Sequence, residues 1–300
     1  MLAIVIPYYK KTFFDQTLRS LAMQTDKRFK VYICDDASPE NPFEIINRFS
    51  NELDLVYHKF DQNMGSFSLV KQWNRSIKIT NDEKWLMILG DDDFLGPDVI
   101  EKWYANLPVF EKISNVVRFA TKTINEKLQT ITDAYIHPQL EPAANFWFRR
   151  FKEETRSSLS EHVFSRQAFE QHGFRDYPLA WHSDDMSWLE FSGQKAVFSI
   201  NDAIVYIRMS EINISGKSDN FLLKDVATAQ FYKDLLTEKA ALFNKLQRLE
   251  LLMAYEVIIK RHREPNLHEW KLLLRSYLTN FKIWSFTKSL RRFAISIVKK

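Results

Sequence analysis

Short apolar runs alternate with amphipathic segments over the first hundred residues of the chain. The apolar runs predict buried strands at Leu2–Ile6, Lys30–Cys34, Asp54–Tyr57 and Trp85–Leu89. The segments between them predict helices at Thr12–Gln24, Pro42–Phe49 and Ser66–Ile79. We expect Phe13 and Phe67 to face inward from the first and the last of these helices. Such alternation is typical of βαβ units, so it predicts a mostly parallel sheet with helices on both faces.

The pattern is less regular beyond residue 105 and wholly helical beyond Gly216. In the middle region it predicts strands at Val116–Thr121, Ser158–Phe164, Ala196–Ile200 and Ala203–Arg208, and helices at Ala144–Lys152, Arg166–His172 and Ser183–Phe191. Farther on, apolar residues recur at helical spacing, at Leu242, Leu246, Leu249, Met253 and Val257, and Leu267–Phe281 begins another helix. The sequence thus predicts an α/β domain over residues 1–216, with halves 1–105 and 106–216, and a helical region over 217–300.

Composition excludes several classes of protein. Three hundred residues with 45% hydrophobic content bury a sizeable core. The single Cys34 excludes an intramolecular disulfide framework and fits a reducing compartment, and clustered Cys and His residues of a structural zinc site are absent. No stretch approaches the ~18 consecutive apolar residues of a membrane span. The N-terminal residues show no signal peptide, so we expect a cytoplasmic protein.

Positive charge is concentrated at the C-terminus. Eight Lys or Arg and no acid occur between Lys271 and Lys300, whereas the other 270 residues carry 34 bases against 38 acids. This distribution argues against nucleic-acid binding, which needs a basic footprint on the folded domain.

The last segment has the pattern of a basic amphipathic helix. Its apolar residues are Ile283, Phe286, Leu290, Phe293, Ala294 and Ile297, and its basic residues are Lys288, Arg291, Arg292 and Lys299. Two interpretations stay open: peripheral binding to an anionic membrane surface, or a terminal helix packed on its neighbours with a solvated basic side.

Three polar loops follow predicted strands, at Pro7-Tyr8-Tyr9, Asp35-Asp36-Ala37-Ser38 and Gly90-Asp91-Asp92-Asp93. In open α/β sheets ligands bind at the carboxyl ends of the strands, which is the edge these loops share. Three consecutive carboxylates repel one another, and Mg²⁺ or Mn²⁺ binds through one or two carboxylates together with substrate phosphates. The residues alone leave a second interpretation open, an acidic turn that precedes a helix starting at Pro97.

Glycine-rich phosphate-binding motifs are absent. The chain has only six glycines and contains neither G-x-G-x-x-G nor G-x-x-x-x-G-K-[ST]. Dinucleotide oxidoreductases and P-loop NTPases are therefore poor candidates.

Five segments, in order, resemble the inverting GT-A glycosyltransferases of family 2. They are the opening strand and loop Ile4–Lys10, the helix end Ser20–Thr25, the strand end Cys34–Ser38, Asn63–Gly65 with Trp73-Asn74, and the strand end Leu89–Pro97. The resemblance covers residues 1 to about 216, and most strongly the first 105. It implies a GT-A fold, a Rossmann-like nucleotide-binding sheet, followed by a helical C-terminal extension.

The resemblance also implies roles for the acids of the loops. Asp36 would hydrogen-bond the base, expected to be uracil, beside Pro7 and Tyr9. Asp91 would lie by the ribose. Asp92 would hold a Mg²⁺ or Mn²⁺ ion at this DXD-type motif, with its neighbour Asp93 as the second metal-binding candidate. Many members carry D-x-D-D here, so Gly90 departs from the first Asp of that pattern.

Two later segments extend the resemblance. Asp184 and Asp185 match an acidic pair whose second member is the usual general base, which implies Asp185 as base and Asp184 as a possible acceptor or diphosphate contact; helix capping is the local alternative. Tyr206–Ser215 resembles a Y-R-x-H segment with Ser210 at the His position, which makes Arg208 a candidate for diphosphate binding or for a strand-end ion pair.

The implied function is inverting transfer of a sugar from a nucleotide sugar, expected to be a UDP-sugar, to a hydroxyl of a glycan or lipid-linked acceptor, as in surface polysaccharide biosynthesis. Two other functions fit the same carboxylates. One is a metal-dependent nucleotidyltransferase or phosphohydrolase, and the other is a non-catalytic sugar-nucleotide or glycan-binding protein.

Overall fold

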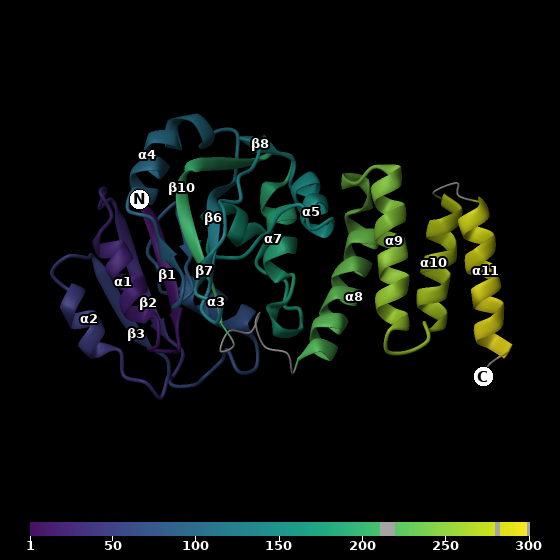
Figure 1. Ribbon diagram of the computed structural model, residues 1–300, viewed down its shortest axis with the longest axis horizontal. Helices are drawn as coiled ribbons and strands as arrows, with labels where there is room; N and C mark the ends of the chain where they lie inside the picture. Colours follow the sequence, from purple (N-terminus) through teal and green to yellow (C-terminus); the bar gives the residue numbers. More distant parts are fainter. Residues whose placement is uncertain (211–219, 280–282, 299–300) are drawn as a thin grey trace. The chain divides into compact units, whose positions relative to one another are not determined.

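The computed structural model describes residues 1–210, 220–279 and 283–298. The chain divides into two compact units (Figure 1): Met1–Asp176 with Ser183–Ser218, and Tyr177–His182 with Asp219–Lys300. Glu211–Ser215 of the predicted Y-R-x-H segment lies outside the described residues.

The first unit is built on one mixed sheet with the strand order β3-β2-β1-β4-β9-β6-β10-β5. Strands β1 to β4 run parallel, β9 runs antiparallel between β4 and β6, and β10 runs parallel to β6. The strands are β1 Leu2–Tyr8, β2 Phe29–Asp35, β3 Leu55–Lys59, β4 Trp85–Ile88, β5 Phe94–Leu95, β6 Val116–Asn125, β7 Thr130–Ile131, β8 Leu140–Glu141, β9 His162–Ser165 and β10 Val197–Met209.

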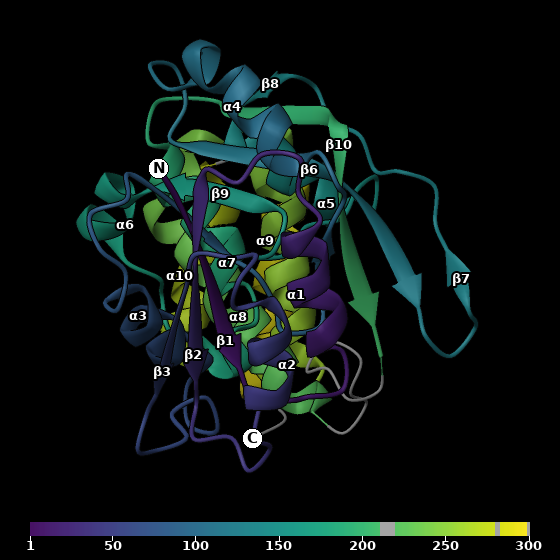
Figure 2. The same cartoon turned by 90° about the vertical axis from the view of Figure 1, so that its left-hand side faces the viewer.

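Seven helices in the described part of this unit flank the sheet (Figure 2). They are α1 Phe14–Ala22, α2 Phe43–Phe49, α3 Leu69–Ile77, α4 Val99–Phe110, α5 Ala143–Phe151, α6 Arg166–His172 and α7 Ser183–Ser192. The α/β fold class predicted from the alternating pattern is confirmed.

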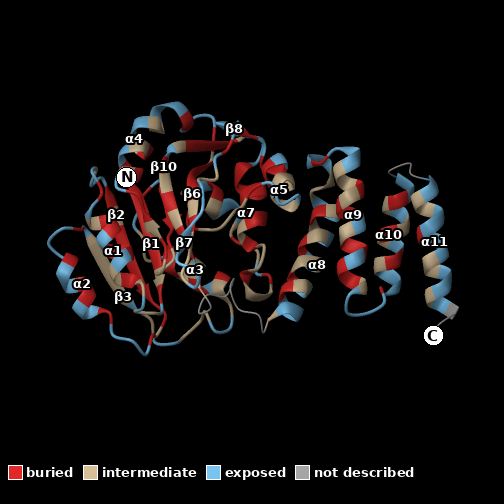
Figure 3. Ribbon diagram, viewed as in Figure 1, coloured by how far each residue is buried: buried red, intermediate tan, exposed pale blue. Residues whose placement is uncertain are grey.

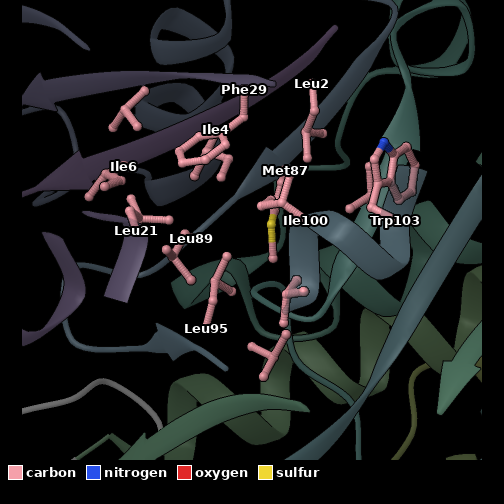
Figure 4. Packing of buried hydrophobic residues seen from close by; sticks show 14 of the residues in the cluster. Leu2, Ile4, Ile6, Leu21, Phe29, Met87, Leu89, Leu95, Ile100 and Trp103 are labelled. Atoms are coloured by element: carbon pink, nitrogen blue, oxygen red, sulfur yellow. The ribbon is translucent and has the colours of Figure 1, made fainter. Parts of the chain in front are cut away.

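The main core lies on one face of the sheet. Ile4 of β1 and Met87 of β4 meet Leu21 of α1 and Ile100 and Trp103 of α4 (Figure 4). Because strand side chains alternate between faces, the neighbours of these residues point the other way. In β2, Ile33 belongs to the same core cluster, whereas the adjacent Cys34 contacts the Ser76 carbonyl of α3 at 3.7 Å, so helices cover both faces.

Some local predictions were wrong. Helix α3 begins at Leu69 because the Ser68 side chain accepts a hydrogen bond from the Lys71 N–H, which places Phe67 before the helix with 87% of its surface exposed. The two strands predicted between Ala196 and Arg208 are the single strand β10, whose pairing with β6 is irregular between Ile200 and Ile204.

The second unit contains four α-helices in its described part: α8 Phe221–Glu238, α9 Lys245–Lys260, α10 Leu267–Thr279 and α11 Ile283–Val298. Its core is formed by one face of α9 with Trp270 and Leu273 of α10. On α9 the apolar residues Leu246, Met253 and Val257 are exposed, since Leu252, Tyr255 and Ile259 of the opposite face supply the core (Figure 3). No described helix is both long and apolar enough to cross a membrane.

Candidate active site

Strand register brings the three polar loops to one edge of the sheet. Tyr8 at the end of β1 pairs with Asp35 at the end of β2, and Val5 pairs with Ile88 near the end of β4. The segments that follow these strands therefore emerge side by side, as the parallel arrangement of the sequence-based prediction requires.

Asp91 connects two of the loops. Its Oδ2 accepts hydrogen bonds from the backbone N–H groups of Tyr9 and Lys10, both at 2.8 Å. Burial raises the pKa of this carboxyl to about 6 in spite of these bonds. Asp91 thus holds the loop after β1 against the loop after β4, and its expected ribose contact stays a prediction.

Asp93 is held from both sides. Ser160 Oγ donates to Asp93 Oδ2 at 2.6 Å, and the Arg208 N–H donates to Oδ1 at 2.8 Å. The side chain is buried, and burial together with the charge of Asp92 raises its pKa to about 7. These bonds favour a structural role for Asp93; metal binding by Asp93 stays a prediction.

Asp92 differs from both of its neighbours. Among the described residues, no side chain donates a hydrogen bond to its carboxylate. Desolvation and the charge of Asp91 raise the pKa of Asp92 to about 6. A partly buried carboxylate whose hydrogen bond comes from its own backbone N–H, next to two further acids, is electrostatically unfavourable and would be stabilised by a hard divalent cation.

The other ligands of such an ion would come from the substrate. In the described part of the chain, no group of three or more His, Cys, Asp or Glu side chains is arranged to hold a metal. Mg²⁺ is commonly bound by one or two carboxylates together with substrate phosphates and water. A single protein carboxylate, such as that of Asp92, would therefore be enough.

The carboxylates of Asp92 and Asp93 lie close to Gly90. A Cβ atom at residue 90 would lie 2.8 Å from Asp92 Oδ1 and 3.2 Å from Asp93 Oδ2. An aspartate at this position, as in the D-x-D-D pattern, would therefore force the Asp92 carboxylate to move. The departure at Gly90 is thus compatible with a metal site that uses Asp92.

Asp36 organises the neighbouring loop. Its two carboxylate oxygens accept the N–H groups of Met64 and Gly65, both at 2.8 Å, and its side chain forms an ion pair with Arg75 of α3. A Cβ atom at Gly65 would lie 2.6 Å from Asp36 Oδ2, which explains the glycine there. Hydrogen bonding of Asp36 to a base stays a prediction.

Pro7 and Tyr9 lie on the same edge of the sheet. Pro7 pairs with Cys34 in the β1–β2 ladder, and the carbonyl of Tyr9 accepts a hydrogen bond from Ser38 Oγ at 2.6 Å. The backbone of Tyr9 is thus fixed twice, by Ser38 and by Asp91, while its side chain is 37% exposed. An exposed aromatic ring on a fixed backbone is suited to contact a nucleotide base.

Arg208 supports the acidic loop from β10. Its Nε donates to the Asp92 carbonyl at 2.9 Å, and its guanidinium forms an ion pair with Glu126 and lies 4.0 Å from the ring centre of Phe13. The strand-end ion pair foreseen as the local alternative is present. Diphosphate binding by Arg208 stays a prediction.

The acid pair of the sequence prediction starts α7, and its two members have different surroundings. Asp185 is buried and forms an ion pair with Arg150 of α5. Asp184 is half-buried, and among the described residues no side chain donates a hydrogen bond to it. Burial and the charge of Asp185 raise the pKa of Asp184 to about 7, against the opposing charge of Arg150.

One short segment connects this acid pair to the acidic loop. Ser160 donates to Asp93, as described above, and the adjacent Glu161 is buried and interacts electrostatically with both Asp184 and Arg150. The chain at residues 160–161 therefore lies between the two groups of acids. Sequence reasoning missed Ser160, Glu161 and Arg150, because isolated Ser, Glu and Arg residues carry no motif.

The fold defines an α/β protein of the GT-A type, with Asp91, Asp92 and Asp93 at the carboxyl edge of its sheet. The sequence model described as "Glycosyl transferase family 2" matches residues 3–175, and the chain belongs to this family. No curated protein matches the chain at the level of sequence.

Solved structures with a similar fold come from TarS of S. aureus. TarS residues 1–349 in complex with UDP-GlcNAc superpose with a TM-score of 0.61 at 14% identity, covering 93% of this chain and 80% of that one. Residues 1–349 in complex with UDP give a TM-score of 0.57 at 15% identity, with coverages of 95% and 82%. For the longer TarS structure the TM-score is 0.60 at 15% identity, and the coverages are 95% and 50%. At such identities the similarity shows the fold.

Proposed function

We propose that this glycosyltransferase moves a sugar from a UDP-sugar to a hydroxyl of a glycan or lipid-linked acceptor, with inversion at the anomeric carbon and with a divalent metal ion. The observation that carries the proposal is the Asp92 carboxylate, to which no described side chain donates a hydrogen bond, at the carboxyl edge of the sheet, where open α/β sheets bind their ligands. The UDP and UDP-GlcNAc complexes of TarS support the choice of nucleotide.

On the donor side, the residues of this chain bind and orient. Asp91 and Asp36 fix the loops on either side of the nucleotide site through backbone N–H groups, and Tyr9 offers its exposed ring. Asp92, carried on a backbone held by Arg208, would hold Mg²⁺ or Mn²⁺. When bound, the ion would neutralise charge on the leaving nucleoside diphosphate.

On the acceptor side, a carboxylate of α7 takes the proton. The acceptor oxygen attacks the anomeric carbon opposite the diphosphate, the bond from that carbon to the diphosphate oxygen breaks, and the acceptor proton passes to the carboxylate. The sequence-based assignment of this role was Asp185. Because Asp185 is buried and paired with Arg150, we propose instead that Asp184 is the base and that the charges of Asp185 and Arg150 set its pKa.

A donor screen tests the proposed function. UDP-, GDP- and dTDP-sugars are incubated with the protein and Mn²⁺ or Mg²⁺, and released nucleoside diphosphate is measured. We expect release from a UDP-sugar, and its loss in EDTA. Binding without turnover for every donor and acceptor would favour the non-catalytic alternative, and turnover unaffected by EDTA would contradict the metal assignment.

Peripheral association with the cytoplasmic membrane face is the remaining part of the proposal. It would bring the site to lipid-linked acceptors, and it rests on the charge pattern of the C-terminal helix.

A further inference from the structure

Helix α11 buries only part of the apolar face that its sequence pattern suggests. Of the six apolar residues on the predicted face, Phe286 and Phe293 pack against the core of the helical unit, and the Phe293 ring centre lies 5.5 Å from that of Trp270. Ser289, between them on the helix, is fully buried. The inward side of α11 therefore contains serine as well as aromatic residues.

The remaining apolar residues of α11 are exposed. Ile283 and Trp284 have 75% and 74% of their surface exposed, and Leu290, Ile295 and Ile297 are exposed as well. Trp284, Lys288, Arg291 and Ile295 follow one another at intervals of four, three and four, so they form one stripe, and Ile283, Leu290 and Ile297 form the stripe beside it. We call these seven residues, all exposed, the outer face of α11.

The basic residues of the tail divide in the same way. Arg292 faces inward, where its Nε and one terminal nitrogen donate to the two carboxylate oxygens of Glu256 at 2.6 and 2.7 Å. Lys288 and Arg291 remain on the outer face, and no described acid forms an ion pair with either. The sequence has no Asp or Glu after Glu269, so nothing within this segment neutralises them.

We propose that the outer face of α11 binds an anionic lipid surface, with the helix lying in the plane of that surface. An exposed Trp and aliphatic residues, interleaved with Lys and Arg, match the interfacial region of a bilayer, where apolar atoms enter the acyl boundary and bases meet lipid phosphates. Lys288 Nζ lies 5.2 Å from the Trp284 ring centre, so the base and the aromatic ring occupy one patch.

A second copy of the chain is the less suitable occupant. A symmetric dimer through this face would bring Lys288 and Arg291 of one copy toward the same residues of the other, and like charges across an interface oppose association. Charge complementarity therefore selects the lipid surface.

The test is co-sedimentation with vesicles, performed without any sugar nucleotide. The full chain should bind vesicles of phosphatidylcholine with 30% phosphatidylglycerol, should not bind pure phosphatidylcholine, and should lose binding as salt rises. Exchanging both outer bases, Lys288→Glu with Arg291→Glu, should weaken binding by at least about 25-fold, since each base near an anionic surface contributes about fivefold.

Control variants elsewhere on the chain test whether vesicle binding depends on the outer face of α11 or on net charge and exposed apolar surface in general. Lys78→Glu with Lys112→Glu changes the net charge equally on exposed residues of the first unit and should bind as wild type. Leu246→Ser with Val257→Ser removes exposed apolar surface from α9 and should also bind as wild type, whereas Trp284→Ser with Ile295→Ser should not. Point variants are preferable to deletion of residues 281–300, because deletion would leave Glu256 without Arg292 and the core without Phe293.

Three results would overturn the proposal: unchanged vesicle binding by the α11 charge variant, an equal loss in the Lys78 and Lys112 variant, or a wild-type dimer in sedimentation that the α11 charge variant abolishes. Thermal unfolding close to wild type is expected for all of these surface variants. The proposed function explains only why the protein would use membrane binding. Vesicle binding and sugar transfer are measured independently, so either can fail while the other is retained.

Discussion

Exchange of Asp92 for asparagine is expected to lower sugar transfer by roughly 10²- to 10³-fold while the thermal unfolding temperature stays within a few degrees of wild type. The amide keeps the shape of the side chain and removes the charge that would hold the cation. The bound cation would lower the activation barrier of sugar transfer by several kcal/mol. No side-chain hydrogen bond of the described residues is lost. The measurements are transfer rate against metal concentration, and thermal unfolding.

Asp93→Asn is the matched control for this variant. Asp93 accepts bonds from Ser160 and from the backbone of Arg208. An amide keeps one oxygen for the Arg208 N–H but turns an NH2 donor toward Ser160 Oγ, which already accepts the Gly90 N–H, and this mismatch costs about 1–3 kcal/mol. We expect a clear loss of stability there. Full transfer by Asp92→Asn, or metal dependence that follows Asp93 instead, would show that the cation is not held by Asp92.

Asp184→Asn is expected to lower kcat by roughly 10²- to 10⁴-fold without changing the donor KM, because it removes the proton acceptor and leaves the donor site intact. In the wild type the ionised carboxylate is the active form. Because the pKa of Asp184 is about 7, kcat should rise with pH through neutrality. This rising limb of the pH profile should be absent in the variant. The measurement is kcat against pH with a saturating acceptor.

Neighbouring variants should shift this limb in opposite directions. The charge of Asp185 raises the pKa of Asp184 and that of Arg150 lowers it, while Glu161 also raises it. Asp185→Asn should therefore move the limb to lower pH, and Arg150→Gln should move it to higher pH. Loss of turnover in Asp185→Asn together with normal turnover in Asp184→Asn would restore the assignment made from the sequence.

Strand ends and loop acids were predictable because their signals are local. The runs that became β1, β2 and β4 are short, apolar and followed at once by polar residues, so their position and the shared edge of their loops followed from the pattern. Phe67 was misplaced because helical periodicity says nothing of the Ser68 cap that starts α3 two residues later.

The roles of individual acids were not predictable, because they depend on residues far away in the chain. Ser160 and Arg208 decide that Asp93 is held on both sides, and Arg150 decides which member of the pair at Asp184 is ion-paired. In the same way, the face that α11 buries is chosen by Trp270 and Glu256 on other helices. Spacing along one helix cannot supply that information.

Product analysis with a sugar-labelled UDP-sugar and a hydroxyl acceptor tests the central claim most directly. We predict that the label appears on the acceptor with its anomeric configuration inverted, as read by NMR, and that UDP is released in equal amount. Label that leaves as sugar phosphate with release of UMP, or that appears on the acceptor with retained configuration, would contradict the account.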